Sequence, residues 1–213
     1  MTSSGTPAPP APSAVPATHA ALRFRSGSGR LCLDFMRTLR LRGTDDAAEE
    51  LDSPEALAAW VAQLGPYPAR YAIPEPTGAE LRAARELREA VHTLLVAARG
   101  KVGPAACPAH ERALLNRTAA GPVARPVLDA TGAMRYESDS PVTATLTEIA
   151  RDALELATSP GMARVRPCAG EHCAAWFLDT SRPGTRRWCS MDTCGNQAKK
   201  TTWRSKHTPG SGD

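Results

Sequence analysis

Aromatic residues are scarce in this 213-residue chain, at 5%, although hydrophobic residues make up 42% of it. A core of this composition has to be built from Leu, Val and Ala, which favours helices over a β-sandwich. The chain has no run of about 18 apolar residues that could span a membrane. Its first residues lack the basic start and apolar core of a signal peptide, so we expect a cytoplasmic protein, in which thiols stay reduced.

Motifs that carry catalysis are also missing. There is no phosphate-binding glycine loop, no internal repeat, and no Ser/His/Asp or Cys/His set whose arrangement in the sequence indicates a catalytic site. We therefore expect that the protein is not an enzyme. The enzymatic alternative would need a ligand pocket in the body of the protein, for which Asp34 and Arg37 are the candidate residues.

Composition divides the chain into four segments. Residues 1–20 are a Pro/Ala-rich tail that we expect to be disordered, because it cannot bury enough apolar surface to offset its ordering entropy. Residues 21–160 form the predicted body, residues 161–206 a small C-terminal module, and residues 207–213 a second disordered tail. The predicted fold class is α+β: a predominantly α-helical body with short β-strands or hairpins, plus a small C-terminal four-cysteine module.

Helix caps and apolar stripes predict four helices in the body, at residues 54–64, 78–99, 109–117 and from 141 to about 158. The first has Ser53 as its N-cap and Pro54 at its first helical position. The second opens on a capping box formed by Thr77 and Glu80. By default Trp60 belongs to the core, and His92 is a boundary histidine.

The remaining body segments are shorter. Residues 126–137 predict a β-hairpin that turns at Gly132. Residues 22–33 predict a short hairpin or two edge strands, after which Asp34 would cap a helix over residues 35–39. The lone cysteines, Cys32 and Cys107, are expected to be small buried apolar residues.

The other four cysteines form two C-x4-C pairs, separated by a loop of about fifteen residues: Cys168 with Cys173, and Cys189 with Cys194. This spacing predicts one structural Zn²⁺ held by four thiolates. His172 in place of Cys173 is an alternative ligand, and the spacing is not the one usual for an iron–sulfur cluster. A site closed by four cysteines leaves no position for activated water, so the metal would serve folding.

Positive charge is concentrated around these cysteines. Residues 164–207 hold nine basic and three acidic residues, a net +6, which leaves −2 for the rest of the chain. Such asymmetry predicts contact with double-stranded DNA, and the segment after Cys194 could form a short helix that enters a groove. The candidate nucleic-acid-binding residues are Arg182, Arg186, Arg187, Lys199, Lys200, Arg204 and Lys206. The alternative is a structural or protein-interaction module whose basic face meets an acidic partner.

Two stretches also resemble known families. W-F-L-D-T-S-R at 176–182 and R-R-W-C-S-M-D-T-C-G-N-Q-A-K at 186–199 resemble the CGNR zinc finger, and L-C-L-D-F-M-R-T-L at 31–39 is similar to the start of the ABATE domain. The resemblance implies a bacterial transcription regulator, with the four cysteines as zinc ligands and a ligand-sensing or stress-related body. We accordingly expect a small-molecule effector or a homodimer.

Two residues depart from the pattern of these families. Gln197 stands where the name-giving arginine of the finger is expected, which removes one cation from the turn after the last cysteine. Arg37 stands where an asparagine is usual, so the role of that position in this chain is in question.

Overall fold

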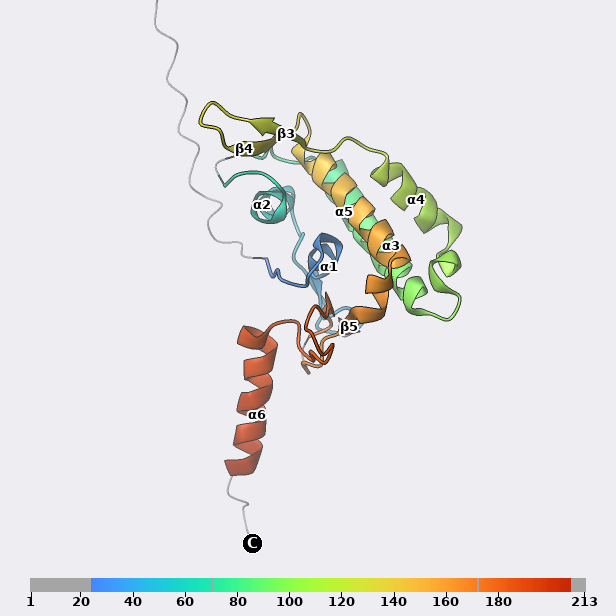
Figure 1. Ribbon diagram of the computed structural model, residues 1–213, viewed down its shortest axis with the longest axis vertical. Coiled ribbons are helices and arrows are strands. Elements are labelled where there is room, and N and C mark those ends of the chain that lie inside the picture. Colours follow the sequence, from blue (N-terminus) through green and yellow to red (C-terminus); the bar gives the residue numbers. More distant parts are fainter. Residues whose placement is uncertain (1–23, 70, 172, 208–213) are drawn as a thin grey trace, which may run out of the picture.

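The computed structural model describes residues 24–69, 71–171 and 173–207. The predicted tail at 1–20 lies outside these residues, as do residues 208–213 of the second tail. The chain forms the predicted α+β fold, a helical body followed by a small cysteine-rich module (Figure 1). Its α-helices are α1 Leu31–Met36, α2 Pro54–Leu64, α3 Gly78–Arg99, α4 Ala109–Ala119, α5 Pro141–Thr158 and α6 Asn196–His207.

The described strands form three separate antiparallel pairs, and three short helical turns complete the elements. The pairs are β1 Leu39–Arg40 with β2 Ala48–Glu49, β3 Arg125–Leu128 with β4 Met134–Glu137, and β5 Val165–Pro167 with β6 Trp176–Leu178. The turns are η1 Gly103–Ala106, η2 Pro160–Arg164 and η3 Met191–Gly195. The β3–β4 hairpin confirms the prediction for residues 126–137.

Local capping explains why α2 and α3 begin where they do. The Ser53 side chain accepts the Ala56 N–H at 3.2 Å, which satisfies an N–H at the start of α2. At α3, Thr77 accepts the Glu80 N–H, and the Glu80 carboxylate accepts the Thr77 N–H at 2.7 Å. Both halves of the predicted capping box are therefore present.

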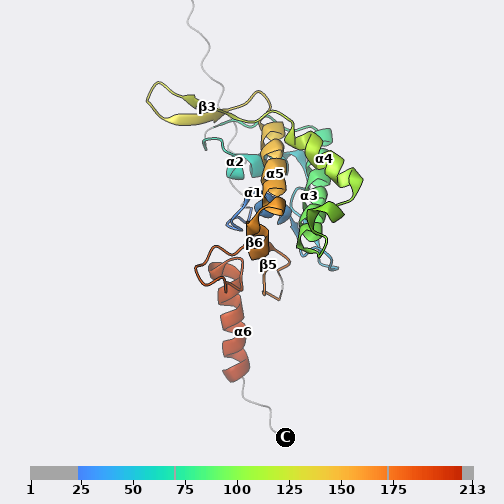
Figure 2. The same cartoon turned by 45° about the vertical axis from the view of Figure 1, so that its right-hand side comes forward.

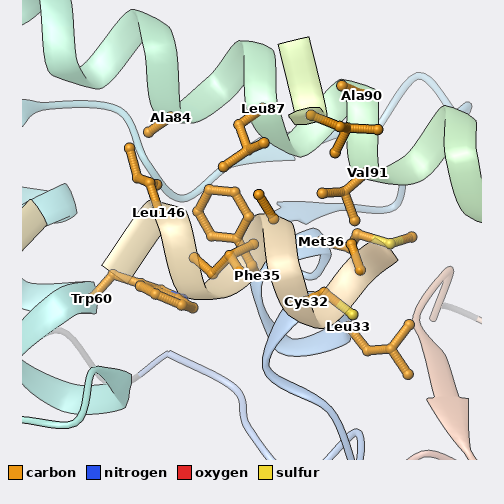
Figure 3. Close-up of a cluster of buried hydrophobic side chains, with 14 of the residues drawn as sticks. Cys32, Leu33, Phe35, Met36, Trp60, Ala84, Leu87, Ala90, Val91 and Leu146 are labelled. Carbon is orange, nitrogen blue, oxygen red and sulfur yellow. The ribbon is translucent and has the colours of Figure 1, made fainter. Parts of the chain in front are cut away.

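Helices α3, α4 and α5 pack against one another, and the short helices α1 and α2 cover the other side of α3 and α5 (Figure 1). Phe35 of α1 points into the core between these layers, where its ring meets Trp60 of α2 edge-on at a centroid distance of 5.1 Å (Figure 3). Both residues are fully buried. Cys32 is also fully buried, and Cys107 is almost fully buried. The predicted apolar roles of Trp60 and the two lone cysteines are confirmed.

The prediction for the N-terminal segment is wrong. Leu22 and Arg23 lie outside the described residues, but residues 31–36 form helix α1 where a strand and the entrance to a later helix were expected. Asp34 lies inside this helix and accepts the N–H groups of Gly27 and Ser28, at 3.2 and 2.8 Å. A backbone N–H at the start of α1, that of Cys32, is instead satisfied by Asp152 of α5, whose carboxylate accepts it at 2.8 Å.

The cysteine-rich module docks on the body through its β5–β6 pair. The Leu178 N–H of β6 donates to the Ser28 carbonyl at 2.8 Å, and Leu178 lies against Gly29. Gly29 has a φ of +88°, a conformation that favours glycine, and a Cβ at this position would lie 3.1 Å from the Leu178 Cβ. The close approach of the module to the body therefore depends on this glycine.

Helix α6 points away from the body in both ribbon views (Figure 2). Its main packing is against η3, the π-helical turn that precedes it. The β3–β4 hairpin projects from the opposite end of the molecule (Figure 2). The prediction of a short helix after Cys194 is confirmed.

Candidate metal centre and basic surface

Four sulfur atoms lie together at the centre of the C-terminal module. Cys168 follows β5, Cys173 precedes β6, Cys189 lies in the loop after β6, and Cys194 belongs to η3. Their Sγ atoms all lie within 4.8 Å of one another. Cys189 Sγ is 3.7 Å from the sulfurs of both Cys173 and Cys194. Zinc–sulfur bonds of about 2.3 Å in a tetrahedron place sulfurs about 3.8 Å apart, so these residues fit Zn²⁺.

Backbone N–H groups surround the sulfur of Cys168. The Cys189 N–H points at it from 3.3 Å and the Gly170 N–H from 3.4 Å. Such donors stabilise a thiolate and orient it toward a metal. Gly170 is needed at this turn, because a Cβ there would lie 3.3 Å from the Cβ atoms of Cys173 and Cys194.

The four thiols influence one another's ionisation. The contact between the sulfurs of Cys189 and Cys173 lowers the pKa of Cys173, because a neighbouring thiol stabilises its thiolate. The same contact raises the pKa of Cys189, because ionising it would place a second negative charge beside the first. A bound cation removes this conflict and lets all four sulfurs ionise together.

The module has a small core of its own. Its buried hydrophobic cluster consists of Phe177 and the three cysteines Cys168, Cys189 and Cys194. Since most of this core consists of metal ligands, apolar burial contributes little to its stability, and the free energy of metal binding supplies the rest. The alternative ligand His172 lies outside the described residues.

Asp179 and Arg186 hold the loop between β6 and Cys189. Asp179 is fully buried and accepts three hydrogen bonds, from the N–H and hydroxyl of Ser181 and from the Arg186 N–H. These donors, the Ser181 hydroxyl first among them, lower the pKa of Asp179. The Arg186 guanidinium donates to the carbonyls of Trp188 and Cys189 and lies over the Phe177 ring at 4.8 Å.

Arg186 was predicted to contact nucleic acid. In the structure, however, its guanidinium is hydrogen-bonded to carbonyls inside the module. Arg182 and Arg187 are exposed on the same loop, and Arg187 lies over Trp188 at 5.2 Å. Lys199 and Lys200 are exposed on α6. Arg204 and Lys206 also belong to α6, but their side chains lie outside the described part. The geometry does not test whether these residues contact DNA, so their nucleic-acid-binding role stays a prediction.

The two candidate pocket residues have different surroundings. The Arg37 side chain is buried, donates to Ser26 O and Ser28 Oγ at 3.1 Å each, and places Nη2 3.9 Å from Cys189 Sγ. Arg37 also lines a pocket between the body and the cysteine module. Asp34 does not line this pocket; its carboxylate holds the loop at Gly27 and Ser28 and lies 3.9 Å from the Arg37 guanidinium.

Sequence reasoning missed most of this pocket. Its wall includes Arg25, Arg40, Arg42 and His92, together with the finger segment 173–176. The only available signal was the recurrence of arginine every two or three residues from 37 to 42. That pattern does not reveal which of the side chains share a surface.

Fold and site together define a helical domain joined to a zinc finger. The chain belongs to the ABATE family, described as "Putative stress-induced transcription regulator", whose model matches residues 29–160. The CGNR zinc finger model matches residues 164–207. The four cysteines are thus the ligand set of a zinc finger for one structural Zn²⁺. A comparison with curated proteins gave no match.

No helix among the described residues is both long and apolar enough to cross a bilayer.

Proposed function

We propose that this protein is a zinc-dependent transcription regulator that binds double-stranded DNA through its finger, while the body senses an effector or forms a homodimer. The observation that carries the proposal is the projection of α6 away from the body, with Lys199 and Lys200 exposed in its second turn. A twelve-residue helix is about 18 Å long and about 10 Å wide, which suits the major groove.

The zinc centre supports this role by positioning the basic surface. Cys194 lies in η3, directly before α6, and Cys189 follows the loop that carries Arg182 and Arg187. One metal therefore holds both basic segments in a fixed relation, and rigidly placed cations neutralise phosphates at a low entropic cost. Gln197 is exposed in the first turn of α6 and offers an amide where the family carries a cation.

The proposal assigns no catalysis to the protein and places it in the cytoplasm. A reducing compartment keeps the four thiols available for the metal. The metal has four sulfur ligands and so has no open position for a substrate.

A salt titration of binding to a fluorescent DNA duplex tests the proposal. If Arg182, Arg187, Lys199 and Lys200 each meet a phosphate, the plot of log K against log salt has a slope of roughly −3 to −4. Replacing Lys199 and Lys200 together by alanine should make this slope shallower by roughly 2. The matched control replaces Arg82 and Arg117, two exposed arginines of the body, and should leave the slope unchanged.

Absence of binding to duplex DNA by the zinc-loaded protein at low salt would exclude this function. Equal affinity for polyglutamate and for DNA would favour the alternative, an interaction module for acidic proteins. In that case the variant with Arg182→Ala and Arg187→Ala, two exposed arginines of the finger, should lose the acidic partner and keep its DNA retention.

A further inference from the structure

We propose that the pocket between the body and the zinc finger binds a small organic anion, a monocarboxylate carried on an apolar or aromatic group. The pocket is partly open to solvent and has a cavity volume of about 40 Å³. Its wall comes from both parts of the chain: the segment from Arg25 to Arg42 and His92 of α3 on one side, and residues 173–176 of the finger on the other. A ligand here would touch both.

The charge of the wall selects an anion. Four arginines line the pocket: Arg25, Arg37, Arg40 and Arg42. Three of them have carboxylate partners: Arg37 lies 3.9 Å from Asp34, Arg40 lies 3.6 Å from Glu50, and Arg42 pairs with Glu89. One positive charge, that of Arg25, therefore remains without an ion pair, which is enough for one carboxylate but not for a polyphosphate.

Arg25 is the residue that is best placed to meet a ligand. It is half-buried, and among the described residues it makes no direct hydrogen bond or ion pair. Burial raises the pKa of Glu50, and the nearby charge of Arg25 partly opposes this rise. A partly desolvated guanidinium without a direct hydrogen-bond partner gains the most from a bidentate carboxylate. Arg37 is less free, because its guanidinium already donates to Ser26 and Ser28 and lies against Cys189.

The remaining wall is apolar. Met36, Leu39 and Leu41 contribute aliphatic surface, and Trp176 and His92 contribute rings whose centroids lie 6.0 Å apart. Flat apolar surface beside fixed cations is the pattern of a site for an amphipathic small molecule. Inorganic phosphate could satisfy the arginines, but it could not use this surface.

Backbone strain is also concentrated at the pocket. Leu41 has a φ of +49°, and it is the only residue other than glycine with a positive φ in the described chain. A branched side chain is strained in this region, and strain of this kind is found where a binding site demands a particular backbone. Leu41 lines the pocket, and its carbonyl accepts the N–H and the hydroxyl of Thr44 in the turn that follows.

A ligand bound in the pocket would affect the finger through direct contacts. Cys173, one of the four zinc ligands, forms part of the pocket wall, and Arg37 connects the wall to Cys189. An anion that draws on Arg37 would weaken its contact with the Cys189 thiolate. The site thus gives an effector a physical route to the metal centre, independent of whether the finger binds DNA.

Calorimetric titration of the zinc-loaded full chain, without DNA, tests the proposal. The probes are benzoate, its neutral isostere benzamide, and inorganic phosphate. Benzoate should bind with one site per chain, and benzamide and phosphate should each bind about tenfold more weakly, since a charge-assisted hydrogen bond and the burial of a ring are each worth about one decade.

Variants at Arg25 locate the site. Arg25→Met should weaken benzoate binding about tenfold, and Arg25→Lys should retain most of it, because the lysine keeps the charge. Arg117→Met on α4, which removes an exposed arginine far from the pocket wall, is the matched control and should bind benzoate normally. Absence of benzoate binding, equal affinity for benzamide or phosphate, or full binding by Arg25→Met would overturn the proposal.

Discussion

The guanidinium of Arg37, at the end of α1, lies 3.9 Å from the sulfur of Cys189, a zinc ligand that is 152 residues away in the sequence. This contact crosses from the body to the finger. The thiolates of a four-cysteine zinc site carry a net charge of −2 with their ion, and Arg37 lies where it offsets part of that charge. Arg37 is therefore placed to act on the metal centre.

Arg37→Met should lower the affinity of the protein for zinc by about tenfold. The substitution keeps much of the side-chain volume but removes the cation beside Cys189, and loss of such an outer partner commonly costs tenfold or more. Competition with a chromophoric chelator measures the change. Arg25→Met is the control, because it removes a cation from the same pocket without touching a sulfur. Equal zinc affinity of Arg37→Met and the parent chain would contradict the assignment.

Gly29→Ala should loosen the docking of the finger on the body, whereas Gly27→Ala should not. Both glycines have a φ of +88°, so alanine is strained by about 1 kcal/mol at either position. Only at Gly29 would the new Cβ meet a neighbour, the Leu178 Cβ at 3.1 Å. Thermal unfolding should show a larger loss for Gly29→Ala, and hydrogen exchange should locate it at the Leu178 N–H. Equal behaviour of the two variants would show that this contact is unimportant.

Removal of zinc should unfold the finger and spare the body. The buried core of the finger consists largely of the ligands themselves, whereas the core of the body is apolar and contains none of them. After chelation, hydrogen exchange should rise in β5 and β6 and remain slow at Leu87 and Val91 in α3. Protection of β5 and β6 that persists in the metal-free protein would mean that packing alone holds the module.

Arg88→Met should destabilise the body by about 3 kcal/mol. Arg88 is buried and forms a bidentate pair with Glu49, with both contacts at 2.6 Å. Removing Arg88 leaves the partly buried Glu49 carboxylate with only the more distant Arg85, 3.7 Å away, and removing one partner is the costly way to break such a pair. Urea unfolding measures the loss. Adding Glu49→Leu to Arg88→Met should recover part of it, and an additive further loss would refute this account.

His92 should make the protein less stable in mild acid. Burial lowers the pKa of His92, and nearby Arg42 lowers it further, against a smaller opposing effect of Glu89. The unfolded chain therefore binds the proton more tightly, so stability falls as the pH drops below about 6.5. The thermal midpoint of the parent chain should fall more between pH 7.5 and 5.5 than that of His92→Gln. An identical fall in both would assign the acid sensitivity to other groups.

Helix boundaries in the body were predictable because their causes are local. Ser53 caps α2 and Thr77 caps α3 through hydrogen bonds to residues three positions away, so the sequence contains both partners. The finger was predictable for a related reason. The four cysteines come in pairs that are close in sequence, and the chemistry of thiolates limits what such a set can bind.

Helix α1 was not predictable from local sequence. Asp34 is a good capping residue, yet the N–H of Cys32 is satisfied by Asp152, 120 residues further along the chain. With that carboxylate in place, Asp34 is free to hold the loop at Gly27 and Ser28 instead. A cap supplied by another element changes which residues are helical. The sequence of residues 22–39 contains no signal that such a distant cap is present.

The sequence by itself therefore determined the helices of the body and the metal ligands, because capping bonds, apolar periodicity and paired cysteines act over short stretches of chain. Only the tertiary structure decided the surroundings of that metal. In that structure the Arg186 side chain points into the finger, and Arg37 lies beside Cys189. Four arginines and His92 line one pocket. Contacts between distant residues depend on how whole elements pack, and short-range patterns do not encode that packing.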